Sequence, residues 1–155
     1  MQDEHFMEIA LDEARQVALL GEVPVGAVVV DPEGKVLGRS GNRPIELNDP
    51  AGHAEMLAMR QAAAALDNYR LTGCTIYVTL EPCPMCAGAM VHARIERVVY
   101  GAEDSKGGGL VSKYRIGSDG LLNHSLQVEG GVLADEAAGL LKGFFRERRD
   151  RSSST

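Results

Sequence analysis

The alternation of apolar and polar residues along the first forty positions predicts one helix followed by a pair of strands. In residues 3–20, apolar side chains recur every three or four positions, which is typical of an amphipathic helix that covers a core. Gly21 ends this pattern, and the β-branched run at residues 26–30 is too apolar for an edge, so we predict a central strand there. The turn sequence at residues 31–34 predicts a hairpin whose second strand covers residues 35–38.

The rest of the chain continues to alternate between helical and strand periodicity. A polar loop is expected at residues 41–50, and a short helix with a loop at residues 111–123. The other predicted elements are helices at residues 51–66, 84–92 and 134–149 and strands at residues 75–80, 97–101 and 125–129. The strand–helix–strand order within residues 75–101 predicts a right-handed parallel crossover. This pattern is typical of α/β proteins, whose sites lie at the carboxyl edge of the sheet.

The size and composition predict one compact domain without a membrane segment. We expect a single domain at residues 1–151 and a disordered tail at residues 152–155, where serines dominate. Hydrophobic residues make up 45% and charged residues 25%, and no apolar stretch approaches the roughly 18 to 20 residues that a membrane span requires. The N-terminus lacks the features of a signal peptide, so a cytoplasmic protein is expected. A phosphate loop is absent from the sequence, which indicates no nucleotide cofactor.

The charge distribution leaves two interpretations of the C-terminal helix open. The formal net charge of −6 argues against a nucleic-acid partner, because phosphate binding depends on Lys and Arg. Residues 142–151 are nevertheless locally basic, which is a footprint of nucleic-acid binding. The alternative is a solvated helix end whose cations interact favourably with the helix dipole.

Two short segments carry the candidate chemistry: His53-Ala54-Glu55, and the Pro-Cys-Pro-Met-Cys run at residues 82–86. A catalytic zinc typically takes three protein ligands and leaves its fourth position for water, and His53, Cys83 and Cys86 supply three. With Pro84 at the first turn of a helix, the two cysteines can converge near the helix N-terminus, where thiolate is favoured. Glu55 is near enough to reach a water on the metal, which is the place for a proton shuttle.

Each cysteine has another possible role. A Cys-x-x-Cys pair alone is also found in redox motifs and structural zinc sites, and it is the combination of H-x-E with P-C-x-x-C that is typical of zinc deaminases. The chain has three cysteines, an odd number, and it is not expected to be secreted. The sequence therefore predicts metal binding or free thiols rather than a disulfide framework. Cys74 is predicted to be a small buried hydrophobe, with a fourth zinc ligand as the alternative.

From Val23 to Arg149, the sequence resembles the bacterial tRNA-specific adenosine deaminases of the cytidine deaminase superfamily. The matching segments are E-V-P-V-G-A-V, G-N-R-P-I, D-P-x-x-H-A-E, N-Y-R-L, Y-V-T-L-E-P-C-x-M-C-A-G-A-M, R-V-V-Y-G-A, L-N-H and F-F-R-x-R-R. Cytosine, cytidine and guanine deaminases share the metal motif. N-R-P-I, N-Y-R-L, L-N-H and the F-F-R-x-R-R end are similar to the tRNA enzymes specifically.

The resemblance implies a three-layer α/β/α fold with a central mixed five-stranded sheet flanked by helices. It also implies one zinc per subunit held by His53, Cys83 and Cys86, with Glu55 as the catalytic proton carrier. The implied activity is hydrolytic deamination of adenosine to inosine at the wobble position, position 34, of the tRNA anticodon loop. The residues implied to bind the substrate nucleotide are Asn42, Asp104, Val23, Leu80 and Ala54.

The resemblance further implies a homodimer that binds the tRNA anticodon stem-loop. The residues implied to contact RNA are Lys106, Arg146, Arg148 and Arg149. The sequence departs from the commoner family pattern at residues 107–112, where it reads Gly-Gly-Gly-Leu-Val-Ser, and at Ser125, where a basic residue is more usual. These departures concern substrate contacts and leave the metal motif intact.

Two other functions remain to be compared with tRNA deamination. A deaminase of a free base or nucleoside, such as guanine, cytosine or cytidine, would use the same zinc and Glu55 but would need no basic C-terminal helix. A non-catalytic, zinc-stabilised RNA-binding partner is the third possibility. Glu55 argues against it, because a structural zinc site has no use for a carboxylate directed at an open coordination position.

Overall fold

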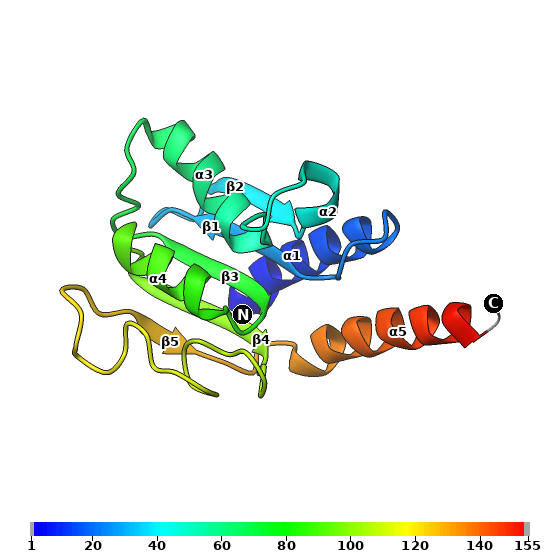
Figure 1. The fold of residues 1–155 in the computed structure, drawn as a ribbon. Coiled ribbons are helices and arrows are strands. Elements are labelled where there is room, and N and C mark those ends of the chain that lie inside the picture. The colour runs from blue at the N-terminus through cyan, green and yellow to red at the C-terminus, as the bar shows by residue number, and fades with distance from the viewer. Residues whose placement is uncertain (1, 154–155) are drawn as a thin grey trace.

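A mixed five-stranded sheet forms the centre of the computed structural model, which describes residues 2–153 (Figure 1). The order across the sheet is β2-β1-β3-β4-β5. β1 pairs antiparallel with both β2 and β3, whereas β3 with β4 and β4 with β5 are parallel. The bounds of the strands are β1 (Gly26–Val30), β2 (Val36–Gly41), β3 (Thr75–Leu80), β4 (Arg97–Ala102) and β5 (Gln127–Glu129). The mixed five-stranded sheet and the parallel crossover are therefore confirmed.

Helices cover both faces of this sheet and complete the expected three layers (Figure 1). α1 (Gln2–Ala18) and α5 (Ala134–Ser153) pack on one face, and α3 (Ala54–Leu66) and α4 (Pro84–His92) on the other. Alternate residues of a strand point to opposite faces, so β1 contributes to two cores. Val28 packs with the α1 side chains, while Val29 packs with those of α3 and α4.

The start of β1 lies directly against α1 because Gly26 has no side chain. A Cβ built on Gly26 would lie 1.8 Å from the backbone oxygen of Ala10, so no other residue fits without moving the helix. The Gly26 amide also donates to Thr79 Oγ1 of β3, at 3.1 Å. This close packing fixes the segment just before β1, which reaches the functional site described below.

The structure differs from the sequence prediction in several boundaries. α1 ends at Ala18 rather than at residue 20, and β2 continues to Gly41. α3 begins at Ala54, so His53 is its N-cap with an extended backbone and does not lie inside the first turn. The one-turn helix α2 (Pro44–Leu47) was expected to be loop; Pro44 at its first position pre-sets the backbone dihedral that a helix needs.

Three expectations near the C-terminal end differ from the structure. Residues 103–126 contain turns and no helix, because Gly117 and Gly120 adopt positive φ and interrupt any helical run. β5 is confined to residues 127–129. α5 continues to Ser153, so the first two residues of the expected disordered tail are helical, and residues 154–155 lie outside the described part of the chain.

α5 begins against β4 and then extends beyond the sheet as a rod (Figure 1). None of the helices in the described part of the chain combines the length and apolar character that crossing a membrane requires. Cys74 is 1% exposed and packs in the core on the α3 and α4 side, as predicted for a small buried hydrophobe.

Candidate active site

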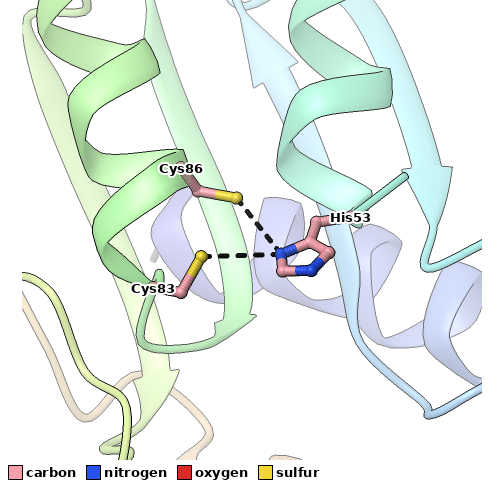
Figure 2. A group of neighbouring side chains, drawn as sticks. All are labelled: His53, Cys83 and Cys86. Carbon is pink, nitrogen blue, oxygen red and sulfur yellow. Dashed lines mark hydrogen bonds between the residues drawn. The ribbon is translucent and has the colours of Figure 1, made fainter. Parts of the chain in front are cut away.

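His53, Cys83 and Cys86 converge on one point between the N-termini of two helices (Figure 2). The sulfurs of Cys83 and Cys86 each lie 3.5 Å from Nδ1 of His53. A tetrahedral zinc with Zn–S near 2.3 Å and Zn–N near 2.0–2.1 Å would hold such a nitrogen and sulfur about 3.5 Å apart. The three donors therefore fit zinc in type and in spacing, and Cys74 does not belong to this group.

Local sequence accounts for this convergence. His53 and Cys83 are the N-cap residues of α3 and α4, each with an extended backbone, and Cys86 lies in the first turn of α4. Pro84 follows Cys83 at the first helical position, where its missing amide hydrogen has no cost. Both helix N-termini point their partial positive charge at the thiols, which favours thiolate.

The pKa values of the two thiols are shifted in opposite directions. The pKa of Cys83 is lowered to about 4, first by its hydrogen bond with Cys86 and then by that with His53. The pKa of Cys86 is raised, because its hydrogen bond to Cys83 and its burial both favour the protonated thiol. A metal cation binds thiolates and displaces their protons, so this arrangement already holds one of the two in the form that zinc requires.

Glu55 is a buried carboxyl group two residues after the histidine. Its exposure is 4%, and burial is the largest of the effects that raise its pKa to about 7. A carboxyl group with a pKa close to neutral can both accept and donate a proton under ordinary conditions. Glu55 therefore has the electrostatic character of a general acid and base.

A cavity of about 200 Å³ opens beside the cysteines and the histidine. Four of the residues expected to bind substrate line it: Val23, Asn42, Leu80 and Asp104. Its complete lining is Val23, Val25, Asn42, His53, Glu55, Leu80, Glu81, Cys83 and Asp104. Ala54 is fully buried beside the site and is not part of this lining.

Val25 and Glu81 also line the cavity, although neither was predicted from the sequence. Glu81 is 2% exposed, and its carboxylate accepts hydrogen bonds from the chain between Asp104 and Ser112. Burial alone would raise its pKa, but these hydrogen bonds outweigh burial and hold the pKa below its usual value. The only signal for Glu81 in the sequence was its position, a carboxylate between the predicted strand at residues 75–80 and Pro82.

The expected RNA-binding residues lie outside this cavity. Lys106 is exposed on the loop that follows β4, and Arg146 and Arg149 are exposed on α5. Arg148 also lies on α5, but its guanidinium donates to the carbonyl of Gly21 and stacks on the Phe144 ring at 4.6 Å. Arg148 thus connects α5 to the segment that follows α1, a contact that no pattern in the sequence indicates.

Comparison with known families identifies relatives that share most of this chain. Residues 1–102 match the family described as the cytidine and deoxycytidylate deaminase zinc-binding region. The chain is 47% identical to the tRNA-specific adenosine deaminase of Haemophilus influenzae over 148 residues, which cover 96% of this chain and 86% of that protein. It is 50% identical to the enzyme of the same name from Agrobacterium fabrum over 145 residues, covering 94% and 95% of the two chains.

Solved structures show the same likeness. A structure from a study of A-to-I editing by deaminases that act at the wobble position of transfer RNA superposes with a TM-score of 0.85 and 50% identity. The match covers 88% of this chain and 99% of that one. A guanine deaminase from Nitrosomonas europaea superposes with a TM-score of 0.80 at 26% identity, covering 91% and 83% of the two chains.

Proposed function

The chain belongs to the tRNA-specific adenosine deaminases, and we propose that it converts adenosine to inosine at the wobble position of the tRNA anticodon loop. In this reaction, water and adenosine give inosine and ammonia: an oxygen of water bonds to C6 of the base, and the bond from C6 to the amine breaks. The roles of the individual residues follow from the groups that line the cavity.

His53, Cys83 and Cys86 are proposed to hold one zinc per subunit. The fit of their spacing to tetrahedral zinc supports this assignment. Zinc bound there would act as a Lewis acid and make water a competent nucleophile near neutral pH. The position of both helix N-termini beside the thiols favours their charged form.

Glu55 is proposed to move the protons of the reaction. Its carboxylate oxygen accepts a proton from the attacking water and delivers it to the ring nitrogen of adenine next to C6. It then passes the second proton to the departing amine, so that ammonia leaves and the carboxylate is regenerated. The raised pKa of Glu55, caused by burial, suits a group that must both take and give a proton.

The other lining residues are proposed to bind the nucleotide. Val23 and Leu80 provide apolar walls that exclude bulk water from the base. The Asn42 amide can donate to and accept from the purine edge, and Asp104 can accept from a ribose hydroxyl. An unstacked loop base enters such a cavity at low cost, which favours an anticodon loop over a duplex.

The exposed cations are proposed to contact the rest of the anticodon stem-loop. Lys106 lies two residues from Asp104, and Arg146 and Arg149 supply further positive charge on α5. Arg148 is assigned a weaker role in RNA binding, because its guanidinium already contacts Gly21 and Phe144. A tRNA substrate also makes the cytoplasm the proposed place of action.

A homodimer is proposed as the active form. A mainly apolar hollow of about 250 Å³ is lined by side chains of α3, of α4 and of the loop between α3 and β3. Its lining includes Met56, Met59, Ala63 and Ala89, and exposed apolar surface of this kind is typical of protein interfaces. A second copy of the chain is the proposed occupant.

The observation that carries the proposed activity is that Glu55 lines one cavity together with His53 and Cys83, two of the three grouped metal-capable donors. The test uses zinc-loaded protein with an anticodon stem-loop that carries adenosine at the wobble position, alongside guanine, cytidine and free adenosine. Ammonia, inosine and zinc per chain are measured. We expect about one zinc per chain and inosine only in the stem-loop.

Ammonia from a free base or nucleoside alone would replace the RNA assignment with the free-base alternative while retaining the zinc chemistry. No product from any substrate, with four protein ligands on the zinc, would indicate a structural metal site. A stem-loop with guanosine at the same position is the matched control and should give no inosine.

A further inference from the structure

We propose that Glu81 is a positioning residue that fixes the loop at residues 104–112 against the metal-binding segment and thereby sets the substrate contacts of Asp104 and Lys106. This inference rests on the proposed function, because it concerns how the same site holds its nucleotide. Glu81 stands between the end of β3 and Cys83, so the carboxylate belongs to the segment that carries a metal ligand.

One carboxylate receives five donors from a single stretch of chain. Oε1 accepts from the Asp104 amide at 3.1 Å and from the Ser112 hydroxyl. Oε2 accepts from the backbone amides of Leu110, Val111 and Ser112 at 3.2, 2.9 and 3.0 Å. An ionised carboxylate has about four lone-pair sites and donates nothing, so its acceptor capacity is fully used here.

The glycines of the loop leave the space that this carboxylate occupies. A Cβ on Gly108 would lie 2.3 Å from Oε2 of Glu81, and a Cβ on Gly109 would lie 2.8 Å from the carbonyl carbon of Cys83. The Gly109 amide also donates to the Pro82 carbonyl at 2.7 Å. Close packing on Glu81 and Cys83 therefore explains the glycines at positions 108 and 109.

The anchored loop is continuous with the substrate cavity. Asp104 lines the cavity, and its Oδ1 accepts from the amides of Lys106 and Gly107 at 3.1 Å each. The Gly108 amide donates to the Asp104 carbonyl at 2.9 Å. The backbone at both ends of this turn is held by Glu81, so a shift of the carboxylate moves Asp104 relative to the metal-binding donors.

The test is Glu81→Gln in the full-length, zinc-loaded protein. The amide has nearly the same shape, but its NH2 group faces backbone donors and cannot accept from them. We expect faster hydrogen–deuterium exchange at residues 104–112 and a KM for the anticodon stem-loop raised roughly 10- to 100-fold. Bound zinc should be unchanged, and kcat should change much less than KM, because Glu55 and the metal donors are untouched.

The matched control is Glu103→Gln, which removes the same charge from an exposed residue of the same loop. This control should leave both exchange and KM close to those of the unmodified chain. Gly108→Ala tests the same contact by a change in the loop, because the added methyl group would displace the carboxylate of Glu81. The double variant Glu81→Gln/Gly108→Ala should have a KM no higher than that of the more affected single variant. This is expected when both changes disrupt the same interaction.

Unchanged exchange at residues 110–112 in Glu81→Gln, or a loss of kcat with KM unchanged, would overturn the proposal. If Glu81→Gln does not fold, Ser112→Ala removes only the hydroxyl donor and should raise exchange and KM in the same direction by a smaller factor. Because exchange needs no substrate, it tests the anchor even if the stem-loop proves not to be the substrate.

Discussion

His53 and Glu55 reach one cavity although they are only two residues apart. Two such positions in a helix point about 200° apart, since each residue turns by about 100°. His53 avoids this separation because it is the N-cap of α3 with φ −72° and ψ 151°, whereas helical geometry starts at Ala54. The proposed metal ligand and the proposed proton carrier are thus separated by the change of backbone conformation at the helix start.

Replacing Glu55 with Gln should retain zinc and abolish most of the activity. The amide has nearly the same size but cannot carry the proton, and a positioned acid and base of this kind contributes about 10²- to 10⁴-fold in rate. We therefore expect single-turnover inosine formation to fall by at least about 100-fold, with metal content unchanged by elemental analysis.

Glu33→Gln is the control for this prediction, because Glu33 is an exposed carboxylate in the turn between β1 and β2. Its rate and metal content should match those of the unmodified protein. Near-normal turnover of Glu55→Gln with zinc bound would remove Glu55 from the chemical step.

At the level of secondary structure, α1 is fastened to the sheet by a carboxylate in its first turn. Asp3 accepts from both terminal nitrogens of Arg97 on β4, at 2.9 and 2.6 Å, and from the Tyr77 hydroxyl on β3 at 2.8 Å. The Arg97 hydrogen bonds are the largest cause of the lowered pKa of Asp3, about 2. The Arg97 guanidinium also binds Glu129, so one residue joins α1, β4 and β5.

Asp3→Asn should destabilise the fold by about 1 to 2 kcal/mol at pH 7, allowing for the partial exposure of the pair. The folded-state pKa lies below the usual value of 3.8, so the stabilisation is complete above about pH 5. It is lost as the pH falls towards 2. Chemical denaturation of both proteins between pH 7 and pH 2.5 should show their difference in unfolding free energy shrink across this range.

Asp12→Asn is the control on the same helix. Asp12 pairs with Arg15 three residues away, and its side chain is 58% exposed. An exposed pair of this kind contributes about 0 to 1 kcal/mol, so its loss should have a much smaller effect. Equal destabilisation by the two substitutions would contradict the anchoring role of Asp3.

Across the complete protein, the two faces of the sheet are unequal. On the face covered by α1 and α5, α5 extends beyond the sheet (Figure 1). Arg148 connects α5 to Gly21, in the segment that follows α1. On the other face, α3 and α4 retain the apolar hollow that is the proposed dimer contact. The cavity and the proposed dimer contact therefore share α3, whereas the basic helix α5 lies on the opposite face of the sheet.

Ala89→Arg should convert the proposed homodimer to a monomer. Ala89 is partly exposed in the hollow, and a large charged side chain there would lie in an apolar contact. We expect the dimer dissociation constant to rise by about 100-fold or more, measured by analytical ultracentrifugation. Circular dichroism should show that the fold is retained.

Leu121→Arg is the matched control, because Leu121 is 83% exposed on a loop remote in sequence from α3 and α4. It should leave the dissociation constant unchanged. A monomeric unmodified protein, or an Ala89→Arg variant that dimerises equally well, would reject this face as the interface.

The sequence by itself determined the features that depend on neighbouring residues. The alternation of apolar residues located the five strands and the principal helices, because each periodicity reflects the local backbone geometry. The residue types and local spacing in the sequence indicated His53, Cys83 and Cys86 as candidate metal donors, and the structure brings these three together, two of them at the start of one helix. Pro84 and the extended residue before it made the start of α4 predictable.

Only the tertiary structure decided the contacts between residues far apart in the chain. Glu81 binds amides 29 to 31 positions later, and Arg148 binds a carbonyl 127 positions earlier. Every residue except proline has a backbone N–H, so no side-chain pattern indicates which of these donors a buried carboxylate will accept from. The proposed zinc donors were therefore predictable from local spacing, whereas the loop that shapes the proposed substrate cavity depended on how the sheet brings β3 and the segment after β4 together.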